Sequence, residues 1–190
     1  MIIGIKKLKI KEFMNKNIKY IIEENTFNFN PVEYSDDDTI DNSTVEDITY
    51  YHPKDKVDLF EIIKEKVEEN EFGNDDLIFP NLSDIDTSEI TDMDSLFNVV
   101  FDNVEKPVKL DLSSWNVSNV TRMMAMFNEC KTLIELDLTN WDTSNVKDMY
   151  AMFKYCIKIE KLDLSGFDTS KVKDMSYMFS NCISLTDLNI

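Results

Sequence analysis

The sequence has little glycine and proline, one histidine and no long apolar run. With three glycines and four prolines in 190 residues, it contains neither GxGxxG nor GxxxxGK[ST], which excludes the common glycine-rich phosphate cradles. No window stays apolar for the ~18 residues that a membrane span needs. Near the N-terminus, Lys6, Lys7, Lys9 and Lys11 interrupt the apolar start before a signal-peptide core of ~7–15 residues forms. The sequence therefore predicts a cytoplasmic protein, with the bacterial cell surface as the alternative if an export signal was removed.

Basic residues are also scarce. The chain has 20 basic against 37 acidic residues, a formal net charge of −17. Binding to phosphates or to an anionic membrane needs a basic surface, so we expect neither direct nucleic-acid binding nor membrane binding. The expected partner is another protein with a basic surface, although surplus acid can also serve solubility alone.

The usual signatures of catalysis and of metal binding are missing as well. His52 is the only histidine, stands beside Pro53, and has no serine or cysteine motif near it. The cysteines, Cys130, Cys156 and Cys182, are spaced 26 apart, which does not converge ligands on one zinc ion. On successive helices their backbones would stand ~8–10 Å apart, beyond disulfide reach. We predict no enzyme activity, no cofactor and no metal, and cysteines that serve as reduced core residues.

What the sequence does contain is a repeat. From Leu110, three segments align without a gap: LDLSSWNVSNVTRMMAMFNECKTLIE, LDLTNWDTSNVKDMYAMFKYCIKIEK and LDLSGFDTSKVKDMSYMFSNCISLTD. Trp115, Trp141 and Phe167 recur at an interval of 26. A degenerate copy over Leu82–Phe97 precedes them, and Leu188-Asn189-Ile190 begins another. Units of this length cannot bury an apolar face alone, so the pattern predicts that they stack.

Within each repeat the apolar period changes. Leu136-Asp137-Leu138 alternates as a short strand does. The helical spacing i, i+3, i+4, i+7 is met by Met149, Met152, Phe153 and Cys156. The predicted fold class is an α/β repeat: a short leucine-rich-repeat-like solenoid, with a strand plus a short helix per 26-residue repeat and an N-terminal helical cap. Because strands lie ~4.8 Å apart and helices ~8–10 Å apart, the strand wall would be concave.

Methionine recurs at two positions of the helical stripe in successive copies, and we predict that these methionines are core residues. Seven of the ten methionines occupy equivalent repeat positions beside phenylalanines: Met93, Met123, Met126, Met149, Met152, Met175 and Met178.

Three segments are predicted along the chain. Residues 1–47 comprise a basic N-terminal helix, Ile5–Glu24, and an acidic linker, Glu33–Asp47. Residues 48–81 form a capping helix segment, with a helix over Asp55–Asn70. The apolar face predicted for that helix consists of Val57, Phe60, Ile63 and Val67. Residues 82–190 form the repeat solenoid.

The segments WDTSNVKDMYAMFKYC and FDTSKVKDMSYMFSNC resemble the BspA-like leucine-rich repeat, the 26-residue repeat of bacterial surface proteins. The resemblance spans Leu82–Ile190 and implies a protein that binds host or bacterial partners; shorter members, phage-encoded ones included, lack export signals. Ordinary leucine-rich repeats carry a ladder asparagine where this chain has Trp141. The backbone hydrogen bonds of that ladder must therefore come from other residues, such as Ser144 and Asn145.

One polar column stands out as a candidate partner-binding site: Asp111, Asp137, Asp163 and Asn189, each the outward residue of its strand. Stacked ~4.8 Å apart, neighbouring aspartates repel by about 1 kcal/mol even in water. A repeat that carries this cost in each copy either presents an acidic stripe to basic side chains or uses the aspartates in turns, with Ser113, Thr139 and Ser165 as neighbours.

Three functions fit these features. The first is a non-catalytic protein–protein interaction module. The second is an acidic inhibitor of a nucleic-acid-binding enzyme, of the phage anti-defence or anti-CRISPR type. The third is an exported surface adhesin whose signal is missing from this sequence. A homodimer through the C-terminal edge is a further expectation, because the strand at Leu188-Asn189-Ile190 would leave backbone groups unpaired.

Overall fold

The computed structural model describes residues 50–71, 76–101 and 103–190, all within the unit Asp47–Ile190. The basic helix predicted over Ile5–Glu24 and the linker predicted over Glu33–Asp47 lie outside the described residues.

Two α-helices are present in the described residues, α2 (Lys56–Glu71) and α3 (Leu96–Val100). Asp55 begins α2 as its N-cap: the carboxylate Oδ1 accepts the backbone N–H groups of Val57 at 2.8 Å and Asp58 at 3.0 Å. The helix lies within a residue of its predicted place, Asp55–Asn70. Its apolar face is partly different, because Leu59 is fully buried while Val57 is 65% exposed.

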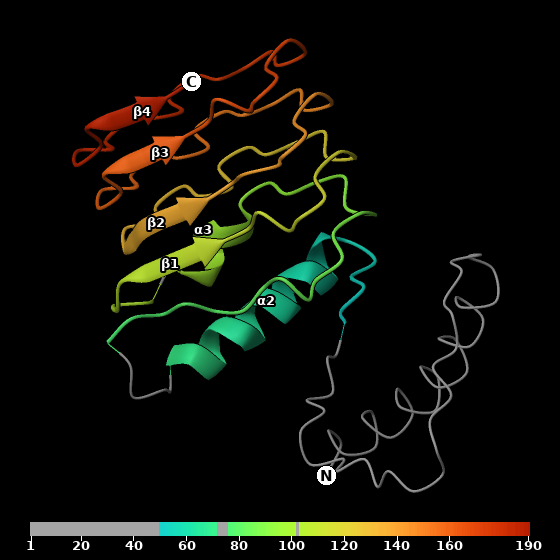
Figure 1. The fold of residues 1–190 in the computed structure, drawn as a ribbon, viewed down its shortest axis with the longest axis vertical. Coiled ribbons are helices and arrows are strands. Elements are labelled where there is room, and N and C mark those ends of the chain that lie inside the picture. Colours follow the sequence, from blue (N-terminus) through green and yellow to red (C-terminus); the bar gives the residue numbers. More distant parts are fainter. Residues whose placement is uncertain (1–49, 72–75, 102) are drawn as a thin grey trace, which may run out of the picture. The chain divides into compact units, whose positions relative to one another are not determined.

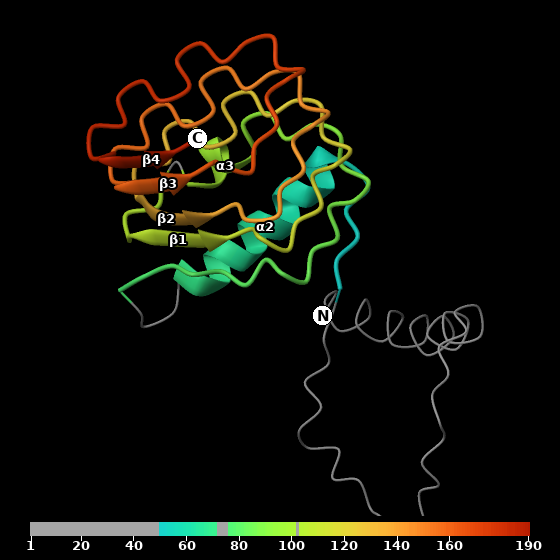
Figure 2. The same ribbon diagram turned by 45° about the horizontal axis from the view of Figure 1, so that its top comes forward.

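Four short strands follow: β1 (Val108–Asp111), β2 (Leu133–Asp137), β3 (Lys161–Asp163) and β4 (Asp187–Asn189). They form two separate two-stranded parallel sheets, β1–β2 and β3–β4. The strands lie side by side in chain order along one flank, and the remainder of each repeat winds through turns (Figures 1 and 2). The 26-residue period sets the register, since Leu110 pairs with Leu136 and Leu162 with Leu188.

The predicted fold class, a solenoid with a strand plus a short helix in each repeat, is wrong. The described residues hold two helices and two small parallel sheets, and neither helix falls within the three gap-free copies. The segment predicted as helical, Met149–Cys156, is a run of turns. The concave strand wall was expected because packed helices lie farther apart than paired strands. The gap-free copies contain no helices, so that expectation has no basis.

Backbone hydrogen bonding explains why these segments are not helices. Alternate N–H groups bond to the next repeat: Ala151 to the Ser176 carbonyl at 2.9 Å, and Phe153 to the Met178 carbonyl at 2.9 Å. The residues between them bond three positions back, as Met152 does to the Met149 carbonyl. Left-handed φ values at Ala151 (54°) and Tyr155 (62°) turn the chain at every fourth residue. Such φ values are incompatible with a continuous right-handed helix.

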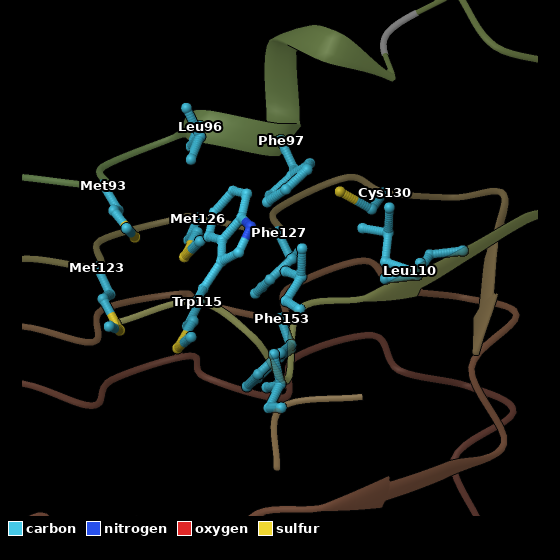
Figure 3. Packing of buried hydrophobic residues seen from close by; sticks show 14 of the residues in the cluster. Met93, Leu96, Phe97, Leu110, Trp115, Met123, Met126, Phe127, Cys130 and Phe153 are labelled. Atoms are coloured by element: carbon cyan, nitrogen blue, oxygen red, sulfur yellow. The ribbon is translucent and has the colours of Figure 1, made fainter. Parts of the chain in front are cut away.

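The apolar residues named from the helical spacing are nevertheless the core. Met149, Met152, Phe153 and Cys156 are fully buried. Four phenylalanines, one per copy, stack face to face with centroid spacings of 5.1, 5.4 and 5.8 Å: Phe97, Phe127, Phe153 and Phe179. The first three lie one above another in the core (Figure 3). Six of the seven repeat methionines are buried, and the exception is Met175 at 46% exposure.

Side-chain donors add further bonds between repeats. The indole Nε1 of Trp115 donates to the Leu82 carbonyl at 3.0 Å, and that of Trp141 to the Leu112 carbonyl at 2.9 Å. The amide of Asn145 donates to the Ser118 carbonyl at 2.9 Å. The prediction that Asn145 takes over part of the asparagine ladder is therefore confirmed, with the tryptophan indoles as additional donors.

We predict that Phe153→Ala unfolds the repeats cooperatively. Phe153 is fully buried between two stacked rings, so truncation loses packing on both faces and costs about 3–5 kcal/mol. Thermal and denaturant unfolding would measure this. A melting temperature within about 2 °C of the parent would contradict the prediction.

In the turns, one copy has an arginine where the other copies have an aspartate, and a second residue, Asp94, compensates for the change. Asp92, Arg122, Asp148 and Asp174 are equivalent residues, joined by successive parallel bridges. Each aspartate accepts the N–H two residues ahead through its own carboxylate. Arg122, the only arginine in the sequence, replaces this aspartate in one copy. There, Asp94 of the preceding copy supplies the carboxylate that accepts the turn N–H. Its Oδ1 accepts the Met124 N–H at 2.7 Å, and its Oδ2 accepts the Arg122 Nε at 2.7 Å.

We predict that Asp94→Ala destabilises the protein by about 1–3 kcal/mol, because it leaves the Met124 N–H without an acceptor. Asp94→Asn should cost less, since the amide oxygen can still accept. Adding Arg122→Asp to Asp94→Ala should recover stability by restoring the turn found in the other copies. Denaturant unfolding of this mutant cycle is the measurement; strictly additive effects would contradict the compensation.

Candidate functional site

The predicted polar column occupies the last position of each strand. Asp111 ends β1, Asp137 ends β2, Asp163 ends β3 and Asn189 ends β4, and all four are exposed. The β-ladders bring Asp111 beside Asp137 and Asp163 beside Asn189. No ladder joins β2 to β3, so the column consists of two pairs and not one continuous row.

Each aspartate of the column also holds a turn. The Asp111 Oδ1 accepts the Ser113 backbone N–H at 3.0 Å, and the Asp137 Oδ1 accepts the Thr139 N–H at 2.8 Å. The hydroxyls of Ser113 and Thr139 donate to the same two Oδ1 atoms at 2.6 Å. At Asp163, Ser165 donates its N–H at 2.9 Å and Asn189 its side-chain amide at 3.1 Å. The column residues are therefore turn-forming aspartates, as one of the two interpretations of the sequence held.

At Asp111 and Asp163 these hydrogen bonds favour the charged carboxylate. The side-chain and then the backbone hydrogen bond from Ser113 lower the pKa of Asp111 below its usual value. The pKa of Asp163 is lowered by the equivalent bonds from Ser165 and further by Asn189. A hydrogen-bonded anion is favoured over the protonated acid, so the turn role and a role in binding cations are compatible.

The neighbouring outward position of the strands has its charge compensated. Lys109 on β1 pairs with Glu135 on β2 at 2.6 Å, and Lys161 on β3 pairs with Asp187 on β4 at 3.8 Å. Such exposed pairs add little stability, but they neutralise this position. Uncompensated negative charge on the strand flank is therefore concentrated at the strand ends.

A groove of about 570 Å³ opens where the two sheets adjoin. We call it the acidic groove and define it by its lining residues: Glu135, Leu136, Asp137, Leu138, Thr139, Asn140, Trp141, Asp142, Asp163, Ser165, Gly166 and Phe167. It contains four carboxylates and no basic residue. Its aromatic part is the stacked pair of Trp141 and Phe167, whose centroids are 6.2 Å apart. Asp137 and Asp163, although not joined by a ladder, both line this groove.

The acidic groove includes residues that the sequence did not single out. The Asp142 Oδ1 accepts the Ser144 N–H at 3.0 Å, and the hydrogen bonds from Ser144 lower the pKa of Asp142. A Cβ added at Gly166 would meet no atom within 4 Å. A signal for Asp142 was available, since Asp168 holds the equivalent position 26 residues later. No signal foretold the gap between the sheets.

A larger groove of about 890 Å³ lies between β2, β3 and β4 and has mixed charge. Lys158 and Lys161 line it together with Glu135, Glu160, Asp163 and Asp187. Because its lysines oppose its acids, it is less selective for a cation than the acidic groove.

The three cysteines are free thiols within the core, as predicted. Cys130 and Cys156 are buried and Cys182 is half-buried. The Cys156 thiol donates to the Phe127 carbonyl at 3.1 Å, and the Cys182 thiol to the Phe153 carbonyl at 3.0 Å. Burial raises the pKa of all three, that of Cys130 well above its usual value. The expected spacing of successive helices does not keep these cysteines apart, because they do not lie on helices.

We predict slow reaction of the native thiols with a thiol reagent, and three free thiols after denaturation. Cys182 should react first, because it is the least buried. Raising the pH to about 9 should accelerate Cys130 and Cys156 far less than a free cysteine, since only the thiolate reacts. Stopped-flow thiol titration followed by mass spectrometry gives the order, and a native disulfide or bound zinc would overturn the assignment.

Other chemistry finds little support in the described part of the chain. No group of three or more His, Cys, Asp and Glu side chains could hold a metal ion there. His52 is exposed, and its Nδ1 lies 3.2 Å from Asp86 Oδ2. No helix in the ranges the structure describes has the length and apolarity that a bilayer crossing requires.

Comparison with protein families gives one match. Residues 98–189, just under half of the chain, are similar to the family described as Mycoplasma protein of unknown function, DUF285. Comparisons with curated proteins and with solved structures give no match. The matched stretch contains the three gap-free copies and the whole acidic groove, so the candidate site lies within the matched residues.

Proposed function

We propose that this protein is a non-catalytic binding module whose acidic groove accepts a basic segment of another protein. The observation that carries the proposal is the composition of the groove, with four carboxylates and no cation among its lining residues. Glu135 is paired with Lys109, which leaves Asp137, Asp142 and Asp163 as the carboxylates for a ligand.

The groove also suits the non-polar part of a lysine or arginine side chain. The half-buried Leu136 and Phe167 provide apolar surface along it, backed by the buried Leu138 and Trp141. Long basic side chains bury their methylene stems on apolar surface while the charged head reaches acceptors. A cation beside an aromatic ring gains further attraction. Leucines, aromatic rings and carboxylates in one groove thus match both parts of such a side chain.

The cytoplasm is the proposed site of action. Three cysteines remain free thiols, which fits a reducing compartment. We also propose that the 26-residue unit is related to the BspA-like repeat, because its motif phenylalanines and cysteines fill equivalent places in successive copies.

We predict that Asp137→Asn combined with Asp163→Asn weakens binding of a lysine–alanine peptide about tenfold and flattens its salt dependence. Asparagine retains the oxygen that accepts the turn N–H, so stability should hold. Asp111→Asn is the matched control, because Asp111 has the same turn but does not line the acidic groove. Equal affinity of the double variant and the parent at every salt concentration would refute the proposal.

Gly166→Leu tests the groove itself and not its charge. The added side chain meets no neighbouring atom at its Cβ, and Gly166 lacks a positive φ, so the fold should tolerate it. Peptide binding should fall about tenfold through occlusion. Ser114→Leu, at the equivalent position of an earlier copy and outside the groove lining, is the control.

If bound peptide is displaced by double-stranded DNA-binding enzymes but not by other basic proteins, the inhibitor function is favoured over the general module.

A further inference from the structure

A second surface lies in the turns that follow β2 and β3. It consists of Tyr150, Tyr155, Tyr177 and Lys154, which we call the tyrosine cluster. Tyr150 and Tyr177 meet edge to face with centroids 5.8 Å apart. The Lys154 ammonium lies 5.2 Å from the Tyr155 ring centroid and 5.6 Å from that of Tyr177. Residues of two successive copies thus form one aromatic and cationic group.

Two of these tyrosines occupy backbone positions that disfavour them. Tyr155 has a φ of 62° and Tyr177 a φ of 61°. Left-handed backbone is unfavourable for an ordinary L-residue and is rare for bulky ones. Equivalent residues in other copies are small or polar: Ala125 and Ala151 correspond to Tyr177, and Glu129 and Asn181 to Tyr155. The fold therefore does not require a tyrosine at either position.

Exposure also argues against a packing role. Tyr177 is 61% exposed and Tyr155 is 37% exposed, while the phenylalanines of the same copies fill the core. Strained residues that the fold does not need are concentrated at binding sites, and exposed tyrosines are frequent anchors in protein interfaces. Strain and exposure together indicate a contact surface.

The cluster carries a lysine with no carboxylate partner in the described part of the chain. Among the described residues no carboxylate lies within 4 Å of the Lys154 ammonium, although the sequence has 37 acidic residues. Glu129, whose backbone N–H bonds to the Lys154 carbonyl at 2.8 Å, pairs instead with Lys131 at 3.1 Å. Lys154 is thus a cation kept available for an external anion.

Lysine and aspartate stand side by side at the turn positions that precede the cluster in the sequence. Exposed Lys147 and Lys173 are stacked, with the Lys173 N–H bonded to the Lys147 carbonyl at 2.9 Å. The neighbouring Asp148 and Asp174 each accept a turn N–H through one carboxylate oxygen. Two lysines thus stand beside two aspartates at this place, in a chain of net charge −17.

We propose that the tyrosine cluster binds a protein segment that presents one glutamate or aspartate among apolar residues. Its carboxylate pairs with the Lys154 ammonium and accepts hydrogen bonds from tyrosine hydroxyls, and its apolar neighbours cover the ring edges. Lys154 lies over one face of Tyr155 and one face of Tyr177, which leaves a nucleobase fewer ring faces on which to stack. A polyanion would also meet the repulsion of the whole acidic chain at many points, whereas one carboxylate meets it once.

Selection from a display library of random short peptides on the full chain is the test. Enrichment of peptides with a single acidic residue flanked by apolar residues is expected. A selected peptide should bind Lys154→Gln about tenfold more weakly. Lys131→Gln is the matched control, and it should leave affinity unchanged. The Asp137→Asn and Asp163→Asn pair should also have no effect, which separates this surface from the acidic groove.

Two further variants distinguish binding from structural support. Tyr155→Asn and Tyr177→Ala introduce residues that other copies carry at these positions. Each should lose peptide affinity while the midpoint of denaturant unfolding holds steady or rises. Loss of stability in both variants would show a structural role and overturn the proposal. So would enrichment of basic peptides, selection of no peptide, or tighter binding of oligothymidylate than of any selected peptide.

Discussion

The parallel backbone hydrogen bonds between successive copies, most of which join residues 25 or 26 apart, are the interaction on which the described unit depends. They run along the strands, where Leu110 meets Leu136, and continue through the turns, where Phe127 donates to Met152 and Phe153 to Met178. Because alternate N–H groups are used between copies, the residues in between close short local turns. The chain thus satisfies its backbone polar groups with few regular elements.

This hydrogen-bond pattern also determines how the core is filled. Equivalent side chains of successive copies are placed about 5 Å apart, which lets flat rings stack and unbranched methionines fill the space beside them. Tryptophan indoles and cysteine thiols reach carbonyls of the preceding copy and so remain satisfied when buried. Tryptophan at Trp115 and Trp141, and cysteine at Cys156 and Cys182, therefore serve both packing and hydrogen bonding.

Both proposed binding surfaces lie where successive copies differ from one another. The acidic groove forms because no ladder joins β2 to β3, and the aspartates that hold the turns line the resulting gap. The tyrosine cluster forms because two adjacent copies replace small or polar residues with tyrosine. The proposed surfaces have opposite charge preferences, so the protein can contact a basic and an acidic segment by separate residues. These two surfaces need no catalytic group.

The sequence alone determined the repeat period, the alignment of copies, the position of α2, and the methionines, phenylalanines and cysteines that fill the core of the repeats, Met175 excepted. These follow from local composition and from apolar spacing, which survive whichever backbone conformation is adopted. It also singled out the strand-end aspartates and offered both a binding role and a turn role for them. Tertiary structure alone decided that Met149–Cys156 is a run of turns. The same i, i+3, i+4 spacing fits turns whose N–H groups bond to another copy, and the choice depends on partners 25 residues away. For the same reason, only the structure could reveal the acidic groove and the meeting of Tyr150, Tyr155 and Tyr177, because each is created by contacts between copies.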